Sequence, residues 1–232
     1  MDFFHKLAVV TGGGTGIGRR IVEAFAAAGG RVAFLDAGEE DCLRLAETLG
    51  PECLFMSGDI SREDVLSEFA ERVVSRFGSV DFLINAVCAD TKGILSGCGY
   101  AEFSRTLQMG AAVPYLLVRL LSGAFSRDAA VVNVAFPAAP LPRADRESYF
   151  AARGALLALT RSLAVSLAGR ARVNMVGPGW TDAPAGDVPE TASPPLARAP
   201  QPDDIVALVL FLCGTGASLI TGQHIAVGGD PL

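Results

Sequence analysis

The residues with the clearest chemistry form a glycine cluster, Thr-Gly-Gly-Gly-Thr-Gly-Ile-Gly, that runs from Thr11 to Gly18. It follows a short apolar run and precedes a stretch with apolar residues at helical spacing. Glycines let a phosphate approach the backbone closely, and the first turn of a helix offers free N–H groups and a positive dipole end. The pattern therefore predicts a pyrophosphate-binding turn. Its predicted contact residues are Gly12, Thr15, Gly16, Ile17 and Gly18.

Asp36 is the second candidate, because it ends the next apolar run after this helix. A carboxylate at that position can accept hydrogen bonds from both hydroxyls of an adenosine ribose, and it repels a 2′-phosphate. No Arg or Lys precedes Gly16 or follows Asp36 closely enough to favour a 2′-phosphate. We therefore predict that the dinucleotide is NAD rather than NADP.

Apolar runs alternate with helical patterns along the whole chain. Strands are expected at 6–11, 31–36, 53–57, 80–86, 130–135, 171–176 and 223–227. Helices are expected between them, near 16–28, 39–49, 62–77, 101–125, 147–168 and 203–213. Continuously apolar strands that alternate with helices indicate a parallel sheet covered on both faces. We predict a single doubly wound α/β domain of the Rossmann type over residues 1–232, with about seven strands.

The segment near 183–202 is rich in Pro, Ala and Gly and follows the sixth expected strand. In such sheets ligands bind beyond the carboxyl ends of the strands. The segment is therefore interpreted either as a short substrate lid or as an ordinary surface loop.

Five motifs resemble those of the classical short-chain dehydrogenase/reductase family, and together they span nearly the whole chain. They are Thr11-Gly12…Gly16-Ile17-Gly18, Asp59-Ile60, Asn85-Ala86-Val87, Pro178-Gly179-Trp180-Thr181 and Ile220-Thr221-Gly222-Gln223. The third departs from the family pattern, because Val87 replaces a glycine. The resemblance adds further expected cofactor contacts. These are Asp59, Ile60, Asn85, Ala86, Pro178, Gly179 and Thr181, with Tyr149 and Arg153.

The family's catalytic set is only partly present. Its members use a Tyr, a Lys four residues later, a Ser about thirteen residues before the Tyr and an Asn on an earlier helix, for general acid–base catalysis. Tyr149 matches the Tyr, but Arg153 replaces the Lys, Phe136 the Ser and Gly110 the Asn. The resemblance thus implies that Tyr149 is the acid/base and that Arg153 holds the cofactor ribose.

These replacements predict a weakened site. Arg is planar and cannot titrate, so it does not substitute conservatively for Lys. Loss of one hydrogen-bond donor to a developing oxyanion costs about 10²–10³ in rate. Pro114 lies four residues after Gly110 and removes an N–H that would bond the Gly110 carbonyl. The pair predicts either a helix break like the one the family's Asn makes or a simple packing kink.

Three functions remain open. The first is an NAD-dependent oxidoreductase with low or altered activity on a small carbonyl or alcohol substrate. The second is an NAD-binding relative with impaired catalysis and a regulatory or partner role. The third is a non-redox enzyme that uses Tyr149 on the same scaffold.

Composition limits the partners and the compartment. The net charge is −6, and no run of Lys or Arg occurs, so neither a nucleic acid nor an anionic membrane is expected to bind. The most apolar segment, 111–125, is expected to be too short to span a membrane and contains Arg119. Neither an export signal nor a metal site is expected, because the first residues lack the basic and long apolar regions of such a signal and the cysteines have no metal-ligand spacing. They are Cys42, Cys53, Cys88, Cys98 and Cys213, and they predict reduced thiols in a cytoplasmic protein.

The expected helix at 148–167 is apolar nearly all round. A helix of this kind must be covered on both sides. Members of the family pair this helix with its copy across a two-fold axis, so the resemblance implies a homodimer or homotetramer.

Overall fold

The computed structural model describes residues 3–87, 93–135, 144–178, 198 and 200–229. Several sequence-based expectations therefore lie outside the described residues: those for Phe136, Gly179, Thr181, the side chain of Pro178 and most of 183–202.

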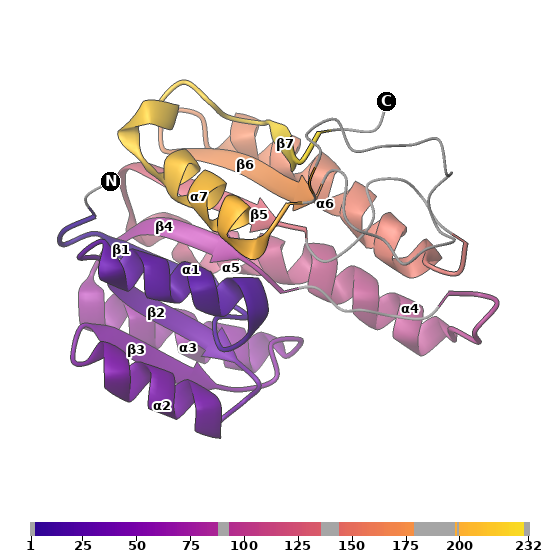
Figure 1. The fold of residues 1–232 in the computed structure, drawn as a ribbon, viewed down its shortest axis with the longest axis horizontal. Coiled ribbons are helices and arrows are strands. Elements are labelled where there is room, and N and C mark those ends of the chain that lie inside the picture. The colour runs from indigo at the N-terminus through magenta and orange to yellow at the C-terminus, as the bar shows by residue number, and fades with distance from the viewer. Residues whose placement is uncertain (1–2, 88–92, 136–143, 179–197, 199, 230–232) are drawn as a thin grey trace.

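Seven parallel strands form one sheet in the order β3-β2-β1-β4-β5-β6-β7, as Figure 1 shows. The strands are β1 (Leu7–Thr11), β2 (Arg31–Asp36), β3 (Cys53–Ser57), β4 (Val80–Asn85), β5 (Phe125–Val134), β6 (Ala171–Pro178) and β7 (His224–Val227). Each of β1 and β4 is buried along its whole length, because helices cover both faces of the sheet. The predicted doubly wound α/β fold is confirmed.

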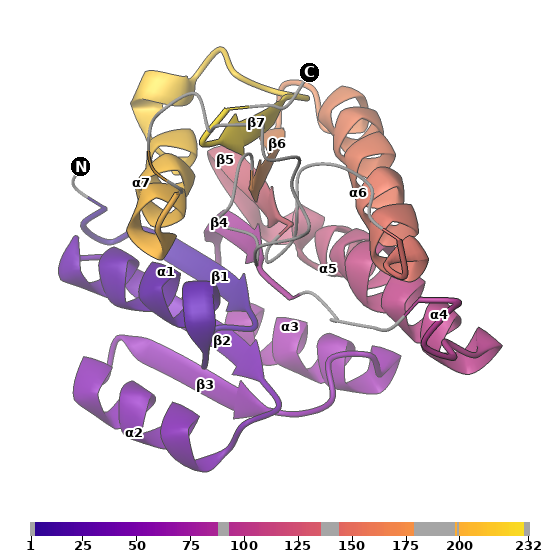
Figure 2. The same ribbon diagram turned by 45° about the vertical axis from the view of Figure 1, so that its right-hand side comes forward.

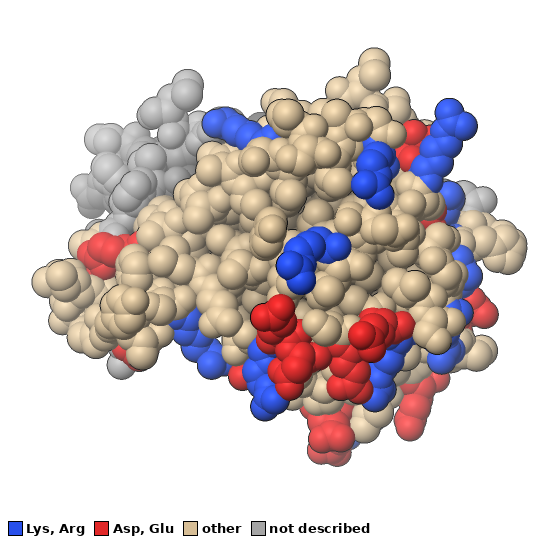
Figure 3. Space-filling model, turned by 180° about the vertical axis from the view of Figure 1, so that it is seen from behind, with Lys and Arg blue, Asp and Glu red and all other residues tan. Residues whose placement is uncertain are grey.

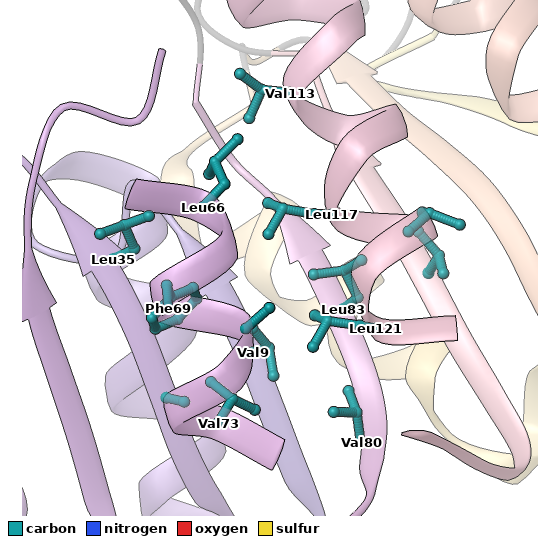
Figure 4. Packing of buried hydrophobic residues seen from close by; sticks show 14 of the residues in the cluster. Val9, Leu35, Leu66, Phe69, Val73, Val80, Leu83, Val113, Leu117 and Leu121 are labelled. Carbon is teal, nitrogen blue, oxygen red and sulfur yellow. The ribbon is translucent and has the colours of Figure 1, made fainter. Parts of the chain in front are cut away.

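Helices cover the sheet in two layers (Figures 1 and 2). One layer holds α1 (Gly16–Ala27), α2 (Glu40–Leu49) and α7 (Pro202–Cys213). The other holds α3 (Glu63–Phe77), α5 (Val113–Leu121) and α6 (Glu147–Ser166), whereas α4 (Tyr100–Leu107) extends beyond the sheet and packs on α6. In the second layer, α3 and α5 pack side by side on the sheet, with fully buried Phe69 and Leu117 facing β-strand residues such as Leu83 (Figure 4).

A π-helical segment, η1 (Gln108–Ala112), joins α4 to α5. The N–H of Val113, the residue after this segment, donates to the Gln108 carbonyl. This bond reaches one residue further back than the bond of an α-helix. Pro114 has no N–H with which to bond the Gly110 carbonyl, so the regular ladder is interrupted here. The irregularity lies where the sequence predicts it, and it fits both interpretations, a break like the one the family's Asn makes and a packing kink.

Tyr100–Ala124 is nonetheless one continuous helical stretch of 25 residues, ending in the 3₁₀ turn Ser122–Ala124. By length and mean hydropathy (1.2) alone it would suffice to cross a membrane. The expectation that this region is too short was therefore wrong. Leu117 and Leu121 on its inner face are fully buried against the sheet, and 33% of its apolar window is buried within the chain.

The start of β5 also differs from the expected strand 130–135. It begins at Phe125, and its first four residues are partly buried or exposed, with Arg127 and Asp128 exposed and Asp128 at φ 65. The strand becomes buried only from Ala129 onward. Apolar patterning could therefore find only its buried second half.

Candidate functional site

A cavity of about 500 Å³ opens at the carboxyl ends of β1 and β4, where the order of the strands reverses. Crevices at such switch points are the usual ligand sites of open α/β sheets. Most of the residues expected to contact a dinucleotide line it. They are Gly12, Thr15, Gly16, Ile17, Gly18, Asp36, Asp59, Ile60 and Ala86.

Close contacts in the turn between β1 and α1 require glycine at two positions. Gly12 has a φ of +70, which L side chains rarely adopt, and a Cβ there would lie 3.0 Å from the Ala86 carbonyl oxygen. A Cβ on Gly18 would lie only 1.9 Å from the Gly12 carbonyl oxygen. The turn therefore needs glycine at both positions, and it brings the N-terminus of α1 to the cavity.

Asp36 is held against this turn. Its Oδ2 accepts a hydrogen bond of 2.9 Å from the Gly14 N–H, and its Oδ1 accepts one of 3.1 Å from the Gly38 N–H. The carboxylate is thus fixed at the cavity wall beside Ala37. A fixed negative charge here favours a neutral sugar over a phosphorylated one.

Asp59 and Ile60 line the cavity beside Asp36, because the Gly58 N–H donates to the Asp36 carbonyl at 3.0 Å. Ser61 donates two hydrogen bonds to Asp59 Oδ1, from its N–H at 3.0 Å and from its hydroxyl at 2.7 Å. These bonds hold the pKa of the Asp59 carboxyl below its usual value. Arg105 of α4 lies 3.6 Å from the same carboxylate and also lines the cavity.

Asn85 differs from its neighbour Ala86, because it is not among the residues that line the cavity. Its side chain is buried, and its Nδ2 donates to Asn133 Oδ1 at 2.8 Å. The Asn133 Nδ2 in turn donates to Thr160 Oγ1 at 2.9 Å. This chain of bonds ties β4 to β5 and α6 beneath the site.

Tyr149 and Arg153 lie one turn apart on α6 and line a second, much smaller cavity of about 20 Å³. Val87 and Val134 line both cavities, so the two adjoin. Tyr149 is only 4% exposed. A space of this size holds about one water molecule.

The far end of Arg153 points toward β6. Its Nη2 lies 3.7 Å from the position of a Cβ built on Gly177, and His224 Nε2 of β7 lies 2.7 Å from the same position. Because Gly177 has no side chain, both of these basic side chains can lie close to the backbone of β6 at this position. Sequence reasoning did not find His224.

Gly110 is in tight contact with α6. A Cβ on it would lie 2.7 Å from Ala152 Cβ. Real Cβ atoms do not approach that closely, so the Asn of the resembled family would not fit here unless α6 moved. The replacement by Gly is thus matched by the packing around it.

Several further cavity residues were missed from the sequence. They are Arg20, Ala37, Arg105, Met109, Val134 and Pro202. Arg20 follows Ile17 by one helical turn and could have been found by its place on the same helix face. Arg105 and Pro202 come from distant elements and carry no comparable local signal.

The comparisons with known proteins agree with this geometry. The family model described as Enoyl-(Acyl carrier protein) reductase matches residues 12–229. The chain is 33% identical to cis-4-hydroxycyclohexanecarboxylate dehydrogenase of Sinomonas cyclohexanicum, over 98% of this chain and 96% of that protein. It is also 33% identical to an uncharacterized short-chain type dehydrogenase/reductase of Sinorhizobium fredii, covering 97% of this chain but 43% of that longer protein.

Solved structures are similar over the full chain. A glucose/ribitol dehydrogenase of the short-chain type from Brucella melitensis has a TM-score of 0.91 at 30% identity, covering 100% of this chain and 99% of the other. A 3-ketoacyl-(acyl-carrier-protein) reductase from the same organism, in complex with NADH, has a TM-score of 0.84 at 28% identity and covers 100% of both chains. A blue fluorescent protein from a metagenomic library, in complex with NADPH, has 0.84 at 26%, with 98% of both covered.

Proposed function

Because this chain belongs to the short-chain dehydrogenase/reductase family, we propose that it binds NAD(H) and interconverts a small alcohol and its carbonyl compound. The observation that carries the proposal is the cavity at the switch point, with a glycine turn on one side and a fixed Asp36 beside it. Positions 12 and 18 admit no Cβ, which fits a turn that a pyrophosphate approaches closely.

The preference for NAD rests on Asp36. One similar structure holds NADH and another holds NADPH, so the family resemblance leaves the choice open. Asp36 presents two carboxylate oxygens to the place where an adenosine ribose would lie. A 2′-phosphate there would bring like charges together.

In the proposed reaction, bound NAD(H) supplies or accepts the hydride. Gly12, Gly16 and Gly18 shape the turn that receives the pyrophosphate, and Asp36 holds the ribose. Tyr149 donates a proton to the carbonyl oxygen in reduction and accepts it in alcohol oxidation. Arg153, one turn along α6, places a permanent positive charge nearby that stabilises negative charge on that oxygen.

A second candidate function is NAD binding without efficient catalysis. It is favoured by the close packing of Gly110 on Ala152 and by the space of about 20 Å³ beside Tyr149. In that case the chain would act through the bound cofactor, in regulation or as a partner subunit. Non-redox chemistry around Tyr149 has no separate observation in its favour.

Calorimetric titration with NAD, NADH, NADP and NADPH tests the proposed cofactor. We expect NAD and NADH to bind at least about tenfold more tightly than their 2′-phosphorylated forms, because repulsion by Asp36 penalises the latter. Equal or tighter binding of NADP(H) would contradict the argument from Asp36. If none of the four bound, the proposed function itself would be wrong.

We further propose that the chain forms a homodimer or homotetramer through the outer face of α6. That face carries small exposed residues, Ala151, Gly154 and Ala158, and ends at Val165, which is 77% exposed. On α5, Tyr115 is 51% exposed. Figure 3 shows this side of the molecule, where the upper half is mostly uncharged and acidic and basic side chains gather in the lower half. Small residues on this face suit close helix–helix contact, and Arg161 is the charged residue exposed between Ala158 and Val165.

Light scattering at micromolar concentration should give a mass of about 48 kDa or a multiple of it, twice the 24.1 kDa of the chain. Val165→Glu should shift the mass toward that of one chain, because it buries a charge at the contact. The matched control is Val74→Glu on α3, also an exposed valine, which should leave the mass unchanged. A mass near 24 kDa for the unaltered protein would contradict the proposed assembly.

The compartment is proposed to be cytoplasmic. Cys42, Cys53, Cys98 and Cys213 are free among the residues that the structure describes. Burial raises the pKa of the Cys53 thiol to about 11, so this thiol stays protonated and unreactive.

A further inference from the structure

Arg20 projects from the second turn of α1 and lines the large cavity together with Pro202 of α7. Its Nη1 lies 2.7 Å from Oδ1 of Asp203, the residue after Pro202. The helices α1 and α7 run side by side in both views of the fold (Figures 1 and 2). The ion pair thus links the second turn of α1 to the first turn of α7 at the edge of the same cavity.

The two neighbouring arginines of α1 have different surroundings. Arg19 pairs with Glu23 on its own helix, at 2.9 Å, and lines a different hollow near α2. Arg20 reaches across to α7 and faces the dinucleotide cavity. The adjacent Asp204 is already bound by Arg198, at 2.6 Å. Arg20 is therefore the arginine of this pair placed to meet an anion at the start of α1.

We propose that Arg20 binds the pyrophosphate of the dinucleotide and gives up Asp203 to do so, an inference that rests on the proposed binding of NAD(H). The side chains of Arg20 and Asp203 are 52% and 79% exposed, and an ion pair that is so exposed contributes little. A pyrophosphate carries more negative charge than one carboxylate, and guanidinium groups bind phosphate oxygens in bidentate geometry. The exchange therefore favours the pyrophosphate.

Asp203 is then a competitor of the cofactor. In the free protein Asp203 pairs with Arg20, and in the complex with the dinucleotide Asp203 has lost this partner. Removing the charge of Asp203 should therefore strengthen binding by way of Arg20. The effect should be confined to ligands that contain a diphosphate.

The test measures dissociation constants for NADH, ADP and adenosine at low ionic strength. Arg20→Gln should weaken NADH and ADP binding by about fivefold to twentyfold and leave adenosine unchanged, because only the first two carry a diphosphate. Arg19→Gln, the matched control, should change each by less than about twofold. Asp203→Asn should tighten NADH and ADP by about twofold to fivefold. Thermal melts of all variants check that the fold is retained.

The double variant Arg20→Gln/Asp203→Asn separates exchange from simple repulsion. If Asp203 acts through Arg20, its removal should bring no gain once Arg20 is absent. An equal gain in both backgrounds would overturn the exchange, because Asp203 would then repel the ligand directly. Unchanged NADH binding by Arg20→Gln would overturn the inference and leave the proposed function intact. A wild-type protein that bound neither NADH nor ADP would overturn both.

Discussion

Replacing Phe136 by Ser and Arg153 by Lys together should raise NADH-dependent reduction of small carbonyl compounds by at least about 100-fold over the wild-type protein. The serine hydroxyl would restore a hydrogen-bond donor to the oxygen that becomes negative in the transition state. The lysine would place a compact ammonium group beside Tyr149, where the planar guanidinium of Arg153 now extends toward Gly177. Phe136 is assigned to this role by its position in the sequence alone.

The two substitutions should be strongly non-additive, because both act on the same developing charge. The rate gain of the double variant should exceed the product of the gains of the two single variants. Steady-state rates with a panel of small aldehydes and ketones, measured by NADH absorbance, give the comparison. Tyr149→Phe in the double background should remove the gain, since it deletes the proposed proton donor.

Adding Gly110→Asn to the double variant is a structural control. This triple variant restores every residue of the family's catalytic set, and on the family pattern alone it would have the highest rate. The contact with Ala152 predicts the opposite, because a Cβ at position 110 would lie 2.7 Å from Ala152 Cβ. We expect the triple variant to be less stable and no faster. A wild-type enzyme that is already fast, and slower as the double variant, would show that the chain has a chemistry of its own.

The fold could be predicted from the sequence because its strands are buried on both faces. Strands such as Val80–Asn85 are apolar almost throughout, and each is followed by a helical pattern. This alternation leaves few alternative architectures. The start of β5 was not predicted for the corresponding reason, since residues at the exposed beginning of a strand need not be apolar.

The residues that line the cavity could be predicted where they are close together in the chain. The glycine turn and Asp36 belong to one β–α–β unit, so their order along the sequence indicates their proximity in space. The packing of Gly110 on Ala152 and the pairing of Arg20 with Asp203 join segments far apart in sequence. No periodicity or motif encodes such contacts, because they depend on how helices sit on the finished sheet.

Substituting Asp36 by Asn should change the cofactor preference more than any other single substitution in the cavity. The variant removes the negative charge and keeps the size of the side chain. Two unit charges about 4 Å apart repel by about 1 kcal/mol in water and about 4 kcal/mol at an effective dielectric constant of 20. For a partly exposed wall position, this corresponds to a gain of about 10- to 100-fold in NADP affinity. NAD should bind about fivefold more weakly, because the amide has one acceptor oxygen instead of two.

Glu39→Gln is the matched control, because it removes the same charge three residues further on, from an exposed side chain that does not line the cavity. It should change the ratio of NADP to NAD affinity by less than about twofold. The effect of Asp36→Asn on this ratio should shrink as salt is added, since screening weakens the repulsion that the substitution removes.

Parallel losses of NAD and NADP affinity in Asp36→Asn would contradict this account. Asp36 also accepts hydrogen bonds from the N–H groups of Gly14 and Gly38, and the amide can replace only one of these acceptors. If holding the turn were its main role, both dinucleotides would suffer equally and the melting temperature would fall. If its charge selects the cofactor, the affinities for NAD and NADP must change in opposite directions. The melting temperature should then change little, because the remaining contacts of the turn involve Gly12, Gly18 and Ala86.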